Sequence, residues 1–355
     1  MKTIGVVSQF PPPPGGMPGQ AAALLEGLRR EKIRVVAVRT NLAGSGLLGK
    51  LDGVRFIRTL VRWPVFLVRL AFAIRRIDIL HILSCSGLYF FLFTIPPVLL
   101  GKLLRRKIIL HYHGGGAEAF FLKWPSLTRW VLVRAHAILV PSEFLHKVFE
   151  KRGLRAEIVG NILNADGFEP RERISVTPNF VVARHLEPPY NIECIIRAFG
   201  LVKKRYREAV LVVAGGGSEE KRLKALAAEM GLSASVQFLG YVDNARMPEI
   251  YRKASIFLNA SNVDNLPVSI LEAFAAGLPV VTTCAGGIAY LVEDGRTGLV
   301  VSLNDHEAMA QKIFLLLENP ELAQKLVTNA RKEVERFSWP EVFNKLSNIY
   351  SLVAS

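Results

Sequence analysis

The stretch DNLPVSILEAFAAGLPVV, residues 264–281, contains the clearest structural signals in the chain. Pro267 is suited to the first residue of a helix, Gly277 to the residue just past its end, and Pro279 to a stop before a new apolar run. The stretch therefore predicts a loop, a helix and a buried strand in succession. This is one repeat of a wound α/β domain.

Two acids interrupt this apolar stretch. Asp264 lies in the loop before the predicted helix, and Glu272 lies inside the helix, more than one turn past its start. An isolated pair of this kind is usually a solvated loop acid and a solvated helix acid. Whether these two carboxylates have a chemical role therefore depends on the segments around them.

The alternation of short apolar runs with helix-like segments, such as 19–30 and 142–152, extends through the whole chain. It predicts an α/β architecture of two doubly wound, Rossmann-like parallel-sheet domains facing across a cleft. The predicted strands are 3–8, 33–39, 79–83, 108–112, 137–140 and 156–159 in the first half and 179–183, 209–214, 236–239, 256–259, 280–283 and 298–301 in the second.

The length of 355 residues also favours two domains, because a single core rarely grows so large. Apolar periodicity lapses over 164–178, where Pro170 and Pro178 flank polar residues. We therefore expect a first domain over 1–175 and a second over 176–337.

The net charge of +15 is confined to the first half: residues 1–178 hold 26 Lys and Arg against 11 Asp and Glu, whereas the remainder holds 19 of each. Such a basic half is suited to an anionic surface, either nucleic acid or lipid headgroups. Over 58–76, arginines alternate with large apolar residues, which favours a bilayer interface, although an ordinary helix with solvated arginines has the same pattern. No helix-turn-helix or zinc module is recognisable, so we expect no nucleic-acid partner. The arginines of the 58–76 stretch are Arg58, Arg62, Arg69, Arg75 and Arg76.

Several features favour a cytoplasmic location. Cys85, Cys194 and Cys284 are widely spaced and odd in number, as in a reducing compartment. The N-terminus lacks the long apolar core of a signal peptide, and the apolar window 87–101 is shorter than the ~20 residues of a spanning helix and contains prolines. We expect a cytoplasmic protein, peripheral on the inner face of the membrane.

Three loops of the second half follow predicted strands: 214–220, 260–267 and 284–290. In wound α/β domains, ligands lie beyond the carboxyl ends of strands, where helix N-termini offer amides to phosphate. The first and third loops are rich in glycine, but a tight turn also needs glycine, and neither loop has the spaced fingerprint of dinucleotide-binding domains. The combination of the three loops in one neutral domain favours a phosphate-bearing ligand.

Two runs of the second half, AGGGSEEKRLKALAAEMGLSASVQFLGYVDN (214–244) and ASNVDNLPVSILEAFAAGLPVVTTCAGGIAYLVEDGRTGLVV (260–301), resemble the nucleotide-sugar domain of family 4 retaining glycosyltransferases, the glycosyl transferases group 1. Members of this family share the two-domain GT-B fold. The first half matches more loosely through QFPPPPGG, HYHGGG and VPSEFLHKVFEKRG, and FSWPEVFNKLSNIY resembles the family's C-terminal helix, which returns to the first domain. The resemblance implies an acceptor-binding domain over 1–175 with a helix at about 338–355, and a donor-binding domain over 176–337.

In this family, two acids eight positions apart flank the donor. Glu272 matches the acid that hydrogen-bonds the ribose hydroxyls, and Asp264 matches the acid near the transferred sugar, which is usually glutamate. The shorter Asp264 is a departure that bears on which sugar fits. The loop between the two acids would also contact the donor through Asn265, Leu266 and Pro267.

Arg184, in VARHLEPPYN, matches the arginine that binds the diphosphate and stabilises charge on the leaving group. The family's partner lysine is absent, and Tyr190 occupies its place. Arg222 or a helix N-terminus facing the phosphate would compensate. Further donor-side residues are Gly215, Gly216, Gly217 and Tyr241.

In the first half, Gly15 and Gly16 match the glycine loop that approaches the donor phosphate. His113, in HYHGGG, matches the histidine at the reaction centre. His111 lies two residues away on the same strand face, so the sequence does not decide between the two histidines. The expected acceptor-side glycines are Gly114 and Gly115.

The resemblance implies a hexosyltransferase-type enzyme that moves a sugar from a nucleotide-diphosphate-sugar to a lipid-linked, polysaccharide or lipopolysaccharide acceptor with retention of configuration. We predict His113, Asp264 and Glu272 as its catalytic residues. No Asp-x-Asp pair and no His or Cys cluster with metal spacing occurs, so we expect no metal and no cofactor beyond the nucleotide-sugar co-substrate. A nucleotide-sugar epimerase of the same fold and a non-catalytic nucleotide-sugar-binding, membrane-associated protein remain as alternatives.

Overall fold

The computed structural model describes residues 2–12, 15–41, 55–169 and 177–355, with the backbone alone over 55–62. The chain divides into two compact units. Unit 1 comprises Met1–Ile162 and Trp339–Ser355, and unit 2 comprises Leu163–Ser338. The boundary expected at 175/176 therefore lies inside unit 2, and the last helix of the chain is part of unit 1.

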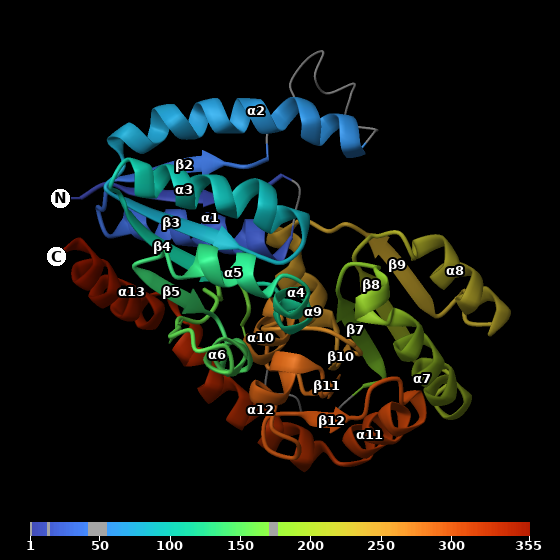
Figure 1. The fold of residues 1–355 in the computed structure, drawn as a ribbon. Helices are drawn as coiled ribbons and strands as arrows, with labels where there is room; N and C mark the ends of the chain where they lie inside the picture. Colours follow the sequence, from blue (N-terminus) through green and yellow to red (C-terminus); the bar gives the residue numbers. More distant parts are fainter. Residues whose placement is uncertain (1, 13–14, 42–54, 170–176) are drawn as a thin grey trace. The chain divides into compact units, whose positions relative to one another are not determined.

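Within its described residues, unit 1 contains a six-stranded parallel sheet in the order β2-β1-β3-β4-β5-β6 (Figure 1). Successive residues of these strands enter opposite cores: Ile108 packs on one face of the sheet and Ile109 on the other. Both faces are apolar, as in other parallel sheets covered by helices. The strands are β1 (Ile4–Ser8), β2 (Val35–Arg39), β3 (Ile79–Ser84), β4 (Lys107–Tyr112), β5 (Ala137–Val140) and β6 (Glu157–Ile158).

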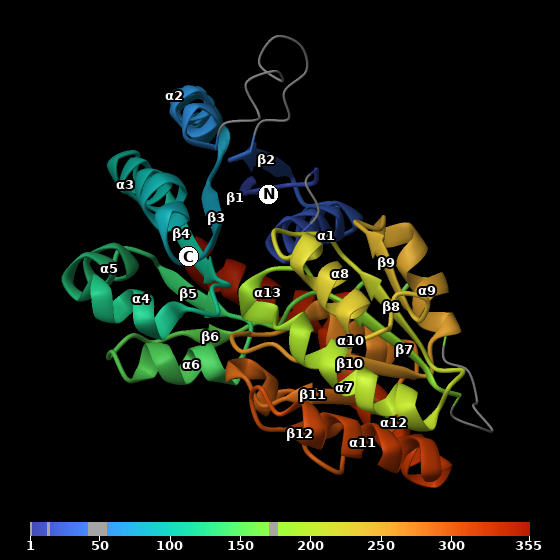
Figure 2. The ribbon, with the colours of Figure 1, turned by 90° about the vertical axis from the view of Figure 1, so that its right-hand side faces the viewer.

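Helices cover both faces of the unit 1 sheet (Figure 2). One face carries α2 (Arg55–Ala73), η2 (Ile74–Arg76), η3 (Phe90–Thr94), α3 (Ile95–Leu103), α4 (Ala117–Lys123), α5 (Pro125–Leu132) and α6 (Glu143–Glu150). The other face carries α1 (Gly16–Arg30) and α13 (Trp339–Ala354). Glycine is needed at Gly27 of α1, because a Cβ there would lie 2.5 Å from the ring of Trp339. The last helix is therefore closely fitted to unit 1.

Within its described residues, unit 2 contains a second six-stranded parallel sheet, in the order β12-β11-β10-β7-β8-β9. The two predicted doubly wound parallel sheets are thus confirmed. The strands are β7 (Asn179–Ala183), β8 (Val210–Ala214), β9 (Val236–Gly240), β10 (Ile256–Asn259), β11 (Val280–Thr283) and β12 (Leu299–Val301).

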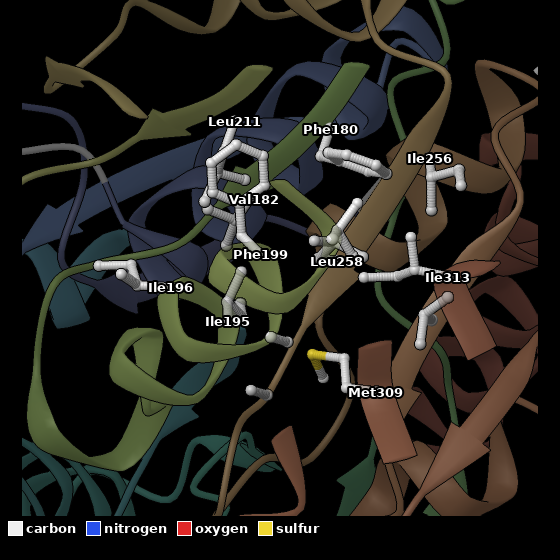
Figure 3. Close-up of a cluster of buried hydrophobic side chains, with 14 of the residues drawn as sticks. Phe180, Val182, Ile195, Ile196, Phe199, Leu211, Ile256, Leu258, Met309 and Ile313 are labelled. Atoms are coloured by element: carbon white, nitrogen blue, oxygen red, sulfur yellow. The ribbon is translucent and has the colours of Figure 1, made fainter. Parts of the chain in front are cut away.

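One face of the unit 2 sheet packs against α7 (Ile192–Arg205), α8 (Glu220–Glu229) and α11 (His306–Glu318). Figure 3 shows this core: Phe180 and Leu258 from the strands meet Phe199 from α7 and Ile313 from α11. The other face packs mainly against α9 (Met247–Lys253) and α10 (Val268–Ala275). The remaining helical elements are η4 (Pro188–Tyr190), η5 (Asn244–Arg246), η6 (Gly286–Tyr290), α12 (Pro320–Val334) and η7 (Glu335–Phe337).

No helix in the described parts of the chain combines the length and the apolar character needed to cross a membrane.

Candidate functional site

The unit 2 sheet has its topological switch point between β7 and β10. The chain adds β8 and β9 on one side of β7, then returns to add β10, β11 and β12 on the other. Wound α/β domains bind ligands at this point, beyond the carboxyl ends of the strands. Arg184 directly follows β7, and Asp264 lies in the loop after β10. The fold therefore brings two of the predicted site residues to the expected place.

Arg184 and Asp264 form an ion pair there, and each side chain is only 12% exposed. Arg184 Nη2 also lies 3.4 Å from Ser261 Oγ, and Asp264 Oδ1 accepts a hydrogen bond of 2.9 Å from the backbone N–H of Asn265. Among the described residues, the buried Nε of Arg184 has no hydrogen-bond partner. A buried donor without an acceptor costs about 1–3 kcal/mol. This atom is therefore available to an acceptor group of a ligand.

Tyr190 lies beside Arg184, with its ring centroid 4.2 Å from the guanidinium carbon. This is cation–π geometry, which is worth about 0.5–2 kcal/mol. Tyr190 ends the short helix η4, and Asn191 then adopts φ +47° and caps α7 by accepting from the Cys194 N–H. Tyr190 thus places an aromatic surface against Arg184 and adds no second charge.

Glu272 points from α10 toward the buried Tyr251 of α9. The Tyr251 hydroxyl lies 2.9 Å from Glu272 Oε2 and 3.1 Å from the Ser269 carbonyl oxygen, so one proton serves two acceptors. Burial raises the pKa of Glu272 to about 7, although the Tyr251 hydrogen bond and the charge of Arg184 both act to lower it. The carboxyl group therefore changes its charge near neutral pH.

Helix α10 begins at Val268, one residue later than the sequence predicts, and Pro267 is its N-cap. The ψ angle of Pro267 is 115°, so its backbone is extended and not helical. Gly277 follows the helix with φ +68°, as expected for the residue past a helix end. Glu272 nevertheless lies more than one turn inside the helix.

The glycines of the 214–220 loop are required by close packing against the segment that follows β7. A Cβ at Gly215 would lie 1.8 Å from the Arg184 carbonyl oxygen, and a Cβ at Gly217 would lie 2.3 Å from the Leu186 carbonyl oxygen. A Cβ at Gly216 would lie 2.8 Å from the ring of Tyr241. The loop therefore fixes the backbone that carries Arg184.

A second pair of glycines supports Asp264 from the loop after β11. The Gly287 N–H donates to the Asp264 carbonyl oxygen at 3.0 Å. A Cβ at Gly286 would lie 2.3 Å from that oxygen, and one at Gly287 would lie 1.6 Å from the Asn265 carbonyl oxygen. The sequence marks this loop only as rich in glycine, whereas the structure shows which backbone it holds.

Arg222 is already engaged by acids. Its guanidinium forms ion pairs with Glu193 and Glu219 and is half exposed. In this arrangement the positive charge of Arg222 is satisfied within unit 2. The role suggested for Arg222, as a substitute for the missing lysine, remains a prediction.

In unit 1, the two candidate histidines have different surroundings. His111 lies in β4 and is 6% exposed, whereas His113 follows the strand and is partly exposed. Their ring centroids are 4.2 Å apart. Burial lowers the pKa of His113 to about 4, and a hydrogen bond with Asn161 partly offsets this effect. His113 is therefore neutral at physiological pH, and it is the more accessible of the two.

His111 belongs to a buried chain of hydrogen bonds that reaches the last helix. Tyr350 Oη of α13 lies 2.6 Å from His81 Nδ1, His81 Nε2 lies 3.3 Å from His111 Nδ1, and His111 Nε2 lies 3.2 Å from the Val159 carbonyl oxygen. The Val159 carbonyl can only accept a hydrogen bond, so the proton of neutral His111 lies on Nε2. His111 Nδ1 then accepts from His81 Nε2, and His81 Nδ1 accepts from the Tyr350 hydroxyl. Burial lowers the pKa of both histidines, that of His81 to about 3.

The glycines predicted in unit 1 lie at the ends of helices and strands. Gly15 is the N-cap of α1, and a Cβ at Gly16 would meet no atom within 4 Å. Gly114 is closely packed, since a Cβ there would lie 2.9 Å from the Ser86 backbone nitrogen. Gly115 lies in the turn that leads to α4. Close packing thus explains Gly114 but leaves Gly16 unexplained.

Tyr251, His81 and Tyr350 are polar partners that the sequence did not reveal. The partner of each is distant in sequence: Tyr350 pairs with His81, and Tyr251 with Glu272. Among the described residues, no group of three or more His, Cys, Asp or Glu side chains is arranged to hold a metal ion.

Comparison with known proteins relates unit 2 to a family. Residues 169–333 match the model of the family described as Glycosyl transferases group 1. The putative glycosyltransferase EpsD of Bacillus subtilis is 26% identical over 257 residues, 68% of this chain and 67% of EpsD. The phosphatidyl-myo-inositol mannosyltransferase of Mycobacterium leprae is 27% identical over 213 residues, 58% of this chain and 56% of that protein. The chain thus spans little more than half of this second relative.

Solved structures extend the similarity to both units. Anabaena HepE in complex with UDP-glucose has a TM-score of 0.78, with 16% sequence identity, over 99% of this chain and 100% of HepE. At this identity the similarity shows a shared fold.

Proposed function

We propose that the protein transfers a sugar from a nucleotide-diphosphate-sugar to an acceptor, since residues 169–333 match the family described as Glycosyl transferases group 1 and the chain has a GT-B fold. One observation carries the proposal. At the switch point of unit 2, Asp264 and Tyr190 both contact the guanidinium of Arg184, whose charge also acts on Glu272. A bound diphosphate would accept from the buried Arg184 Nε.

The proposed roles on the donor side follow from these contacts. Arg184 stabilises the negative charge that grows on the leaving diphosphate, because a fixed cation in a partly dry site needs no reorganisation. Glu272, once ionised, accepts from two hydroxyl groups of the ribose. Asp264 orients Arg184 through the ion pair and lies on the side of the transferred sugar.

We propose a hexosyl donor and retention of configuration. In this reaction the departing phosphate helps to deprotonate the acceptor on the same face of the sugar. The bond from the anomeric carbon to phosphate breaks, the bond to the acceptor oxygen forms, and the acceptor proton passes to phosphate. The protein then contributes positioning and charge stabilisation, with no metal ion.

We further propose that unit 1 binds the acceptor, with His113, Gly114 and Gly115 near the reacting hydroxyl. The acceptor is a lipid-linked sugar or a growing saccharide, and the protein works at the inner face of the membrane. The excess of positive charge in the first half of the chain supports an anionic partner on that side. The lipid acceptor named for the mannosyltransferase relative supports the same choice.

Thermal unfolding with a panel of nucleotide diphosphates and their sugars tests the donor. UDP-sugars come first, since HepE was crystallised with UDP-glucose. A donor at about 100 times its dissociation constant stabilises the protein by ~2.7 kcal/mol. Absence of stabilisation by every nucleotide sugar would overturn the donor assignment.

Donor hydrolysis without acceptor then tests catalysis. We expect slow release of the nucleoside diphosphate, because water reaches the activated sugar when no acceptor is bound. Binding without release would favour the non-catalytic alternative. Conversion of the sugar while it stays attached to the nucleotide would favour the epimerase.

A further inference from the structure

Exposed apolar side chains are concentrated on one layer of unit 1. Among the described residues, eleven of the eighteen exposed large apolar side chains lie between Val65 and Val133. Those of unit 2 are fewer and are spread over several elements and loops. A concentration of this kind on a water-facing surface marks a binding surface for another molecule or a membrane.

Most of these side chains belong to helices α2, α3, α4 and α5, which cover the same face of the sheet (Figure 2). On α2, Phe66 and Leu70 are buried, whereas Val68 and Phe72 are 56% and 66% exposed. The inner residues pack on the sheet, so the exposed ones point away from it.

The next helices of the layer show the same division. On α3, Val98 is buried and Leu103 is 77% exposed. On α4 and α5, Phe121 and Leu132 are buried, whereas Leu122 and Trp130 are 67% and 43% exposed. Each helix thus has an apolar inner side and further apolar groups facing water.

The helices of this layer are in contact with one another, so their outer sides form one surface. Trp63 Nε1 of α2 donates to the Leu92 carbonyl oxygen of η3 at 3.0 Å. The ring of Phe91, also in η3, lies 5.5 Å from the ring of Trp124 between α4 and α5. We call this surface the α2–α5 face. The side chains of Arg58 and Arg62, which the sequence places in the basic stretch, lie outside the described residues.

Basic residues are interspersed on the α2–α5 face. Residues 63–134 contain ten Lys and Arg but only two acids, Asp78 and Glu118. The guanidinium of Arg134, just after α5, lies 3.6 Å from the ring centroid of Trp130 on α5. An aromatic ring beside a cation on an apolar surface suits the boundary between lipid headgroups and acyl chains.

We propose that the α2–α5 face inserts its exposed apolar side chains into an anionic lipid bilayer. Leu103, Leu122 and Trp130 enter the boundary of the acyl chains, and the surrounding Lys and Arg contact the headgroups. The contact is therefore more than adsorption of a basic surface, and it extends beyond α2 to α3, α4 and α5. The contact with the bilayer does not depend on the proposed function. Its use in reaching a lipid-linked acceptor does rest on that function.

Vesicle binding with a matched pair of variants tests the insertion. The test variant carries Leu103→Ser, Leu122→Ser and Val133→Ser, and the control carries Leu303→Ser, Leu315→Ser and Leu352→Ser, which are exposed residues elsewhere. Vesicles contain phosphatidylcholine alone or with phosphatidylserine. We expect the test variant to lose at least about 10-fold in partitioning to anionic vesicles, and the control to bind like wild type.

Vesicle binding at high salt distinguishes insertion of the apolar side chains from adsorption of a basic surface. At 1 M salt, where the Debye length falls to about 3 Å, wild type should remain partly bound to vesicles on which it is already inserted, and the test variant should be released completely. Brominated acyl chains should quench tryptophan emission in wild type, and Trp130→Phe should weaken the quenching. Thermal unfolding checks that each variant is folded.

Three outcomes would overturn the proposal: complete release of wild type by salt without quenching, equal loss by both triple variants, or equal binding to neutral and anionic vesicles. Self-association in solution that disappears in the test variant would instead assign the face to a second copy of the chain. None of these measurements requires a donor or an acceptor, so their failure is distinguishable from failure of the proposed transfer reaction.

Discussion

The two units share a winding pattern but place charge in opposite ways. At the strand ends of unit 2, Arg184 and Asp264 are nearly buried and paired, and Glu272 lies beside them. At the strand ends of unit 1, the buried polar groups are neutral: burial lowers the pKa of His81 and His111, so both are uncharged at physiological pH.

The net charges of the two units differ in the opposite sense. Unit 1 holds 25 Lys and Arg against 9 Asp and Glu, whereas unit 2 holds 20 against 21. Buried charge requires a partner and is retained where it is used, whereas surface charge acts at long range. The comparison teaches that unit 2 balances its charges and buries an ion pair, whereas unit 1 carries a large excess of positive charge.

Removal of Arg184 should have the largest effect. Arg184→Ala deletes the charge-assisted hydrogen bonds to the diphosphate, each worth about 1.5–3 kcal/mol, and should lower kcat/KM at least about 100-fold. It also leaves Asp264 buried without its partner, which destabilises unit 2. The double variant Arg184→Ala/Asp264→Asn should recover stability, measured by urea unfolding, but not turnover. Full activity of the single variant would mean that the buried charge is structural.

Glu272 should control donor affinity in a pH-dependent manner. Its pKa is about 7 against an ordinary value of 4.5, so in the free protein the ionised fraction of Glu272 increases as the pH rises through 7. The ribose hydroxyls of the donor favour the ionised carboxylate of Glu272, so calorimetry should show donor affinity rising as the pH rises through 7. Glu272→Gln should bind about 10- to 100-fold more weakly, with a flat profile over the same range. A steep profile in this variant would assign the titration to another group.

Tyr350→Phe should destabilise the neutral interior of unit 1. The substitution removes the donor to His81 Nδ1 and leaves that buried acceptor unsatisfied, at a cost of about 1–3 kcal/mol. Chemical unfolding monitored by circular dichroism measures the loss. Tyr241→Phe, at a hydroxyl of the exposed Tyr241, is the matched control and should be neutral. If the two variants unfold alike, the hydrogen-bond chain does not stabilise unit 1.

Substitutions of Tyr190 should have the smallest effect on donor affinity, and they separate the contribution of its ring from that of its hydroxyl group. Tyr190→Phe keeps the ring over Arg184 and should preserve donor affinity, whereas Tyr190→Leu removes the cation–π contact and should weaken it about 3- to 10-fold. Tyr190→Lys should retain turnover, since the family has a lysine there. Equal affinities of the Phe and Leu variants would show that the ring does not position Arg184.

Much of the fold could be predicted from the sequence because burial is periodic. The strand expected at 280–283 is β11 exactly as the structure bounds it, and most other strands agree within a residue or two. Helix starts were less accurate. Helix α1 begins at Gly16 and not at residue 19, because Pro18 is tolerated in a first turn where its missing N–H has no role.

The candidate site was predictable only in part. Asp264 and Glu272 were noticed because acids are conspicuous in an apolar stretch, and Arg184 because of its motif. Their partners were not, because Tyr251 and His81 look like ordinary core residues until the fold places them beside Glu272 and Tyr350. Likewise, no local signal shows that Gly287 supports the backbone of Asn265.

The place of α13 in unit 1 has a consequence for the order of events during synthesis. The ribosome makes the sheet of unit 1 first, but Trp339 and Tyr350, which close one of its faces, emerge only after all of unit 2, Leu163–Ser338. At about 5–20 residues per second, roughly 10–35 s pass between the two parts. During that interval the apolar side chains of β1, β3 and α1 that α13 will cover are open to water and to chaperones. The sequence of unit 2 is complete at the end of the interval, before α13 is made. The second unit is therefore the first able to finish folding.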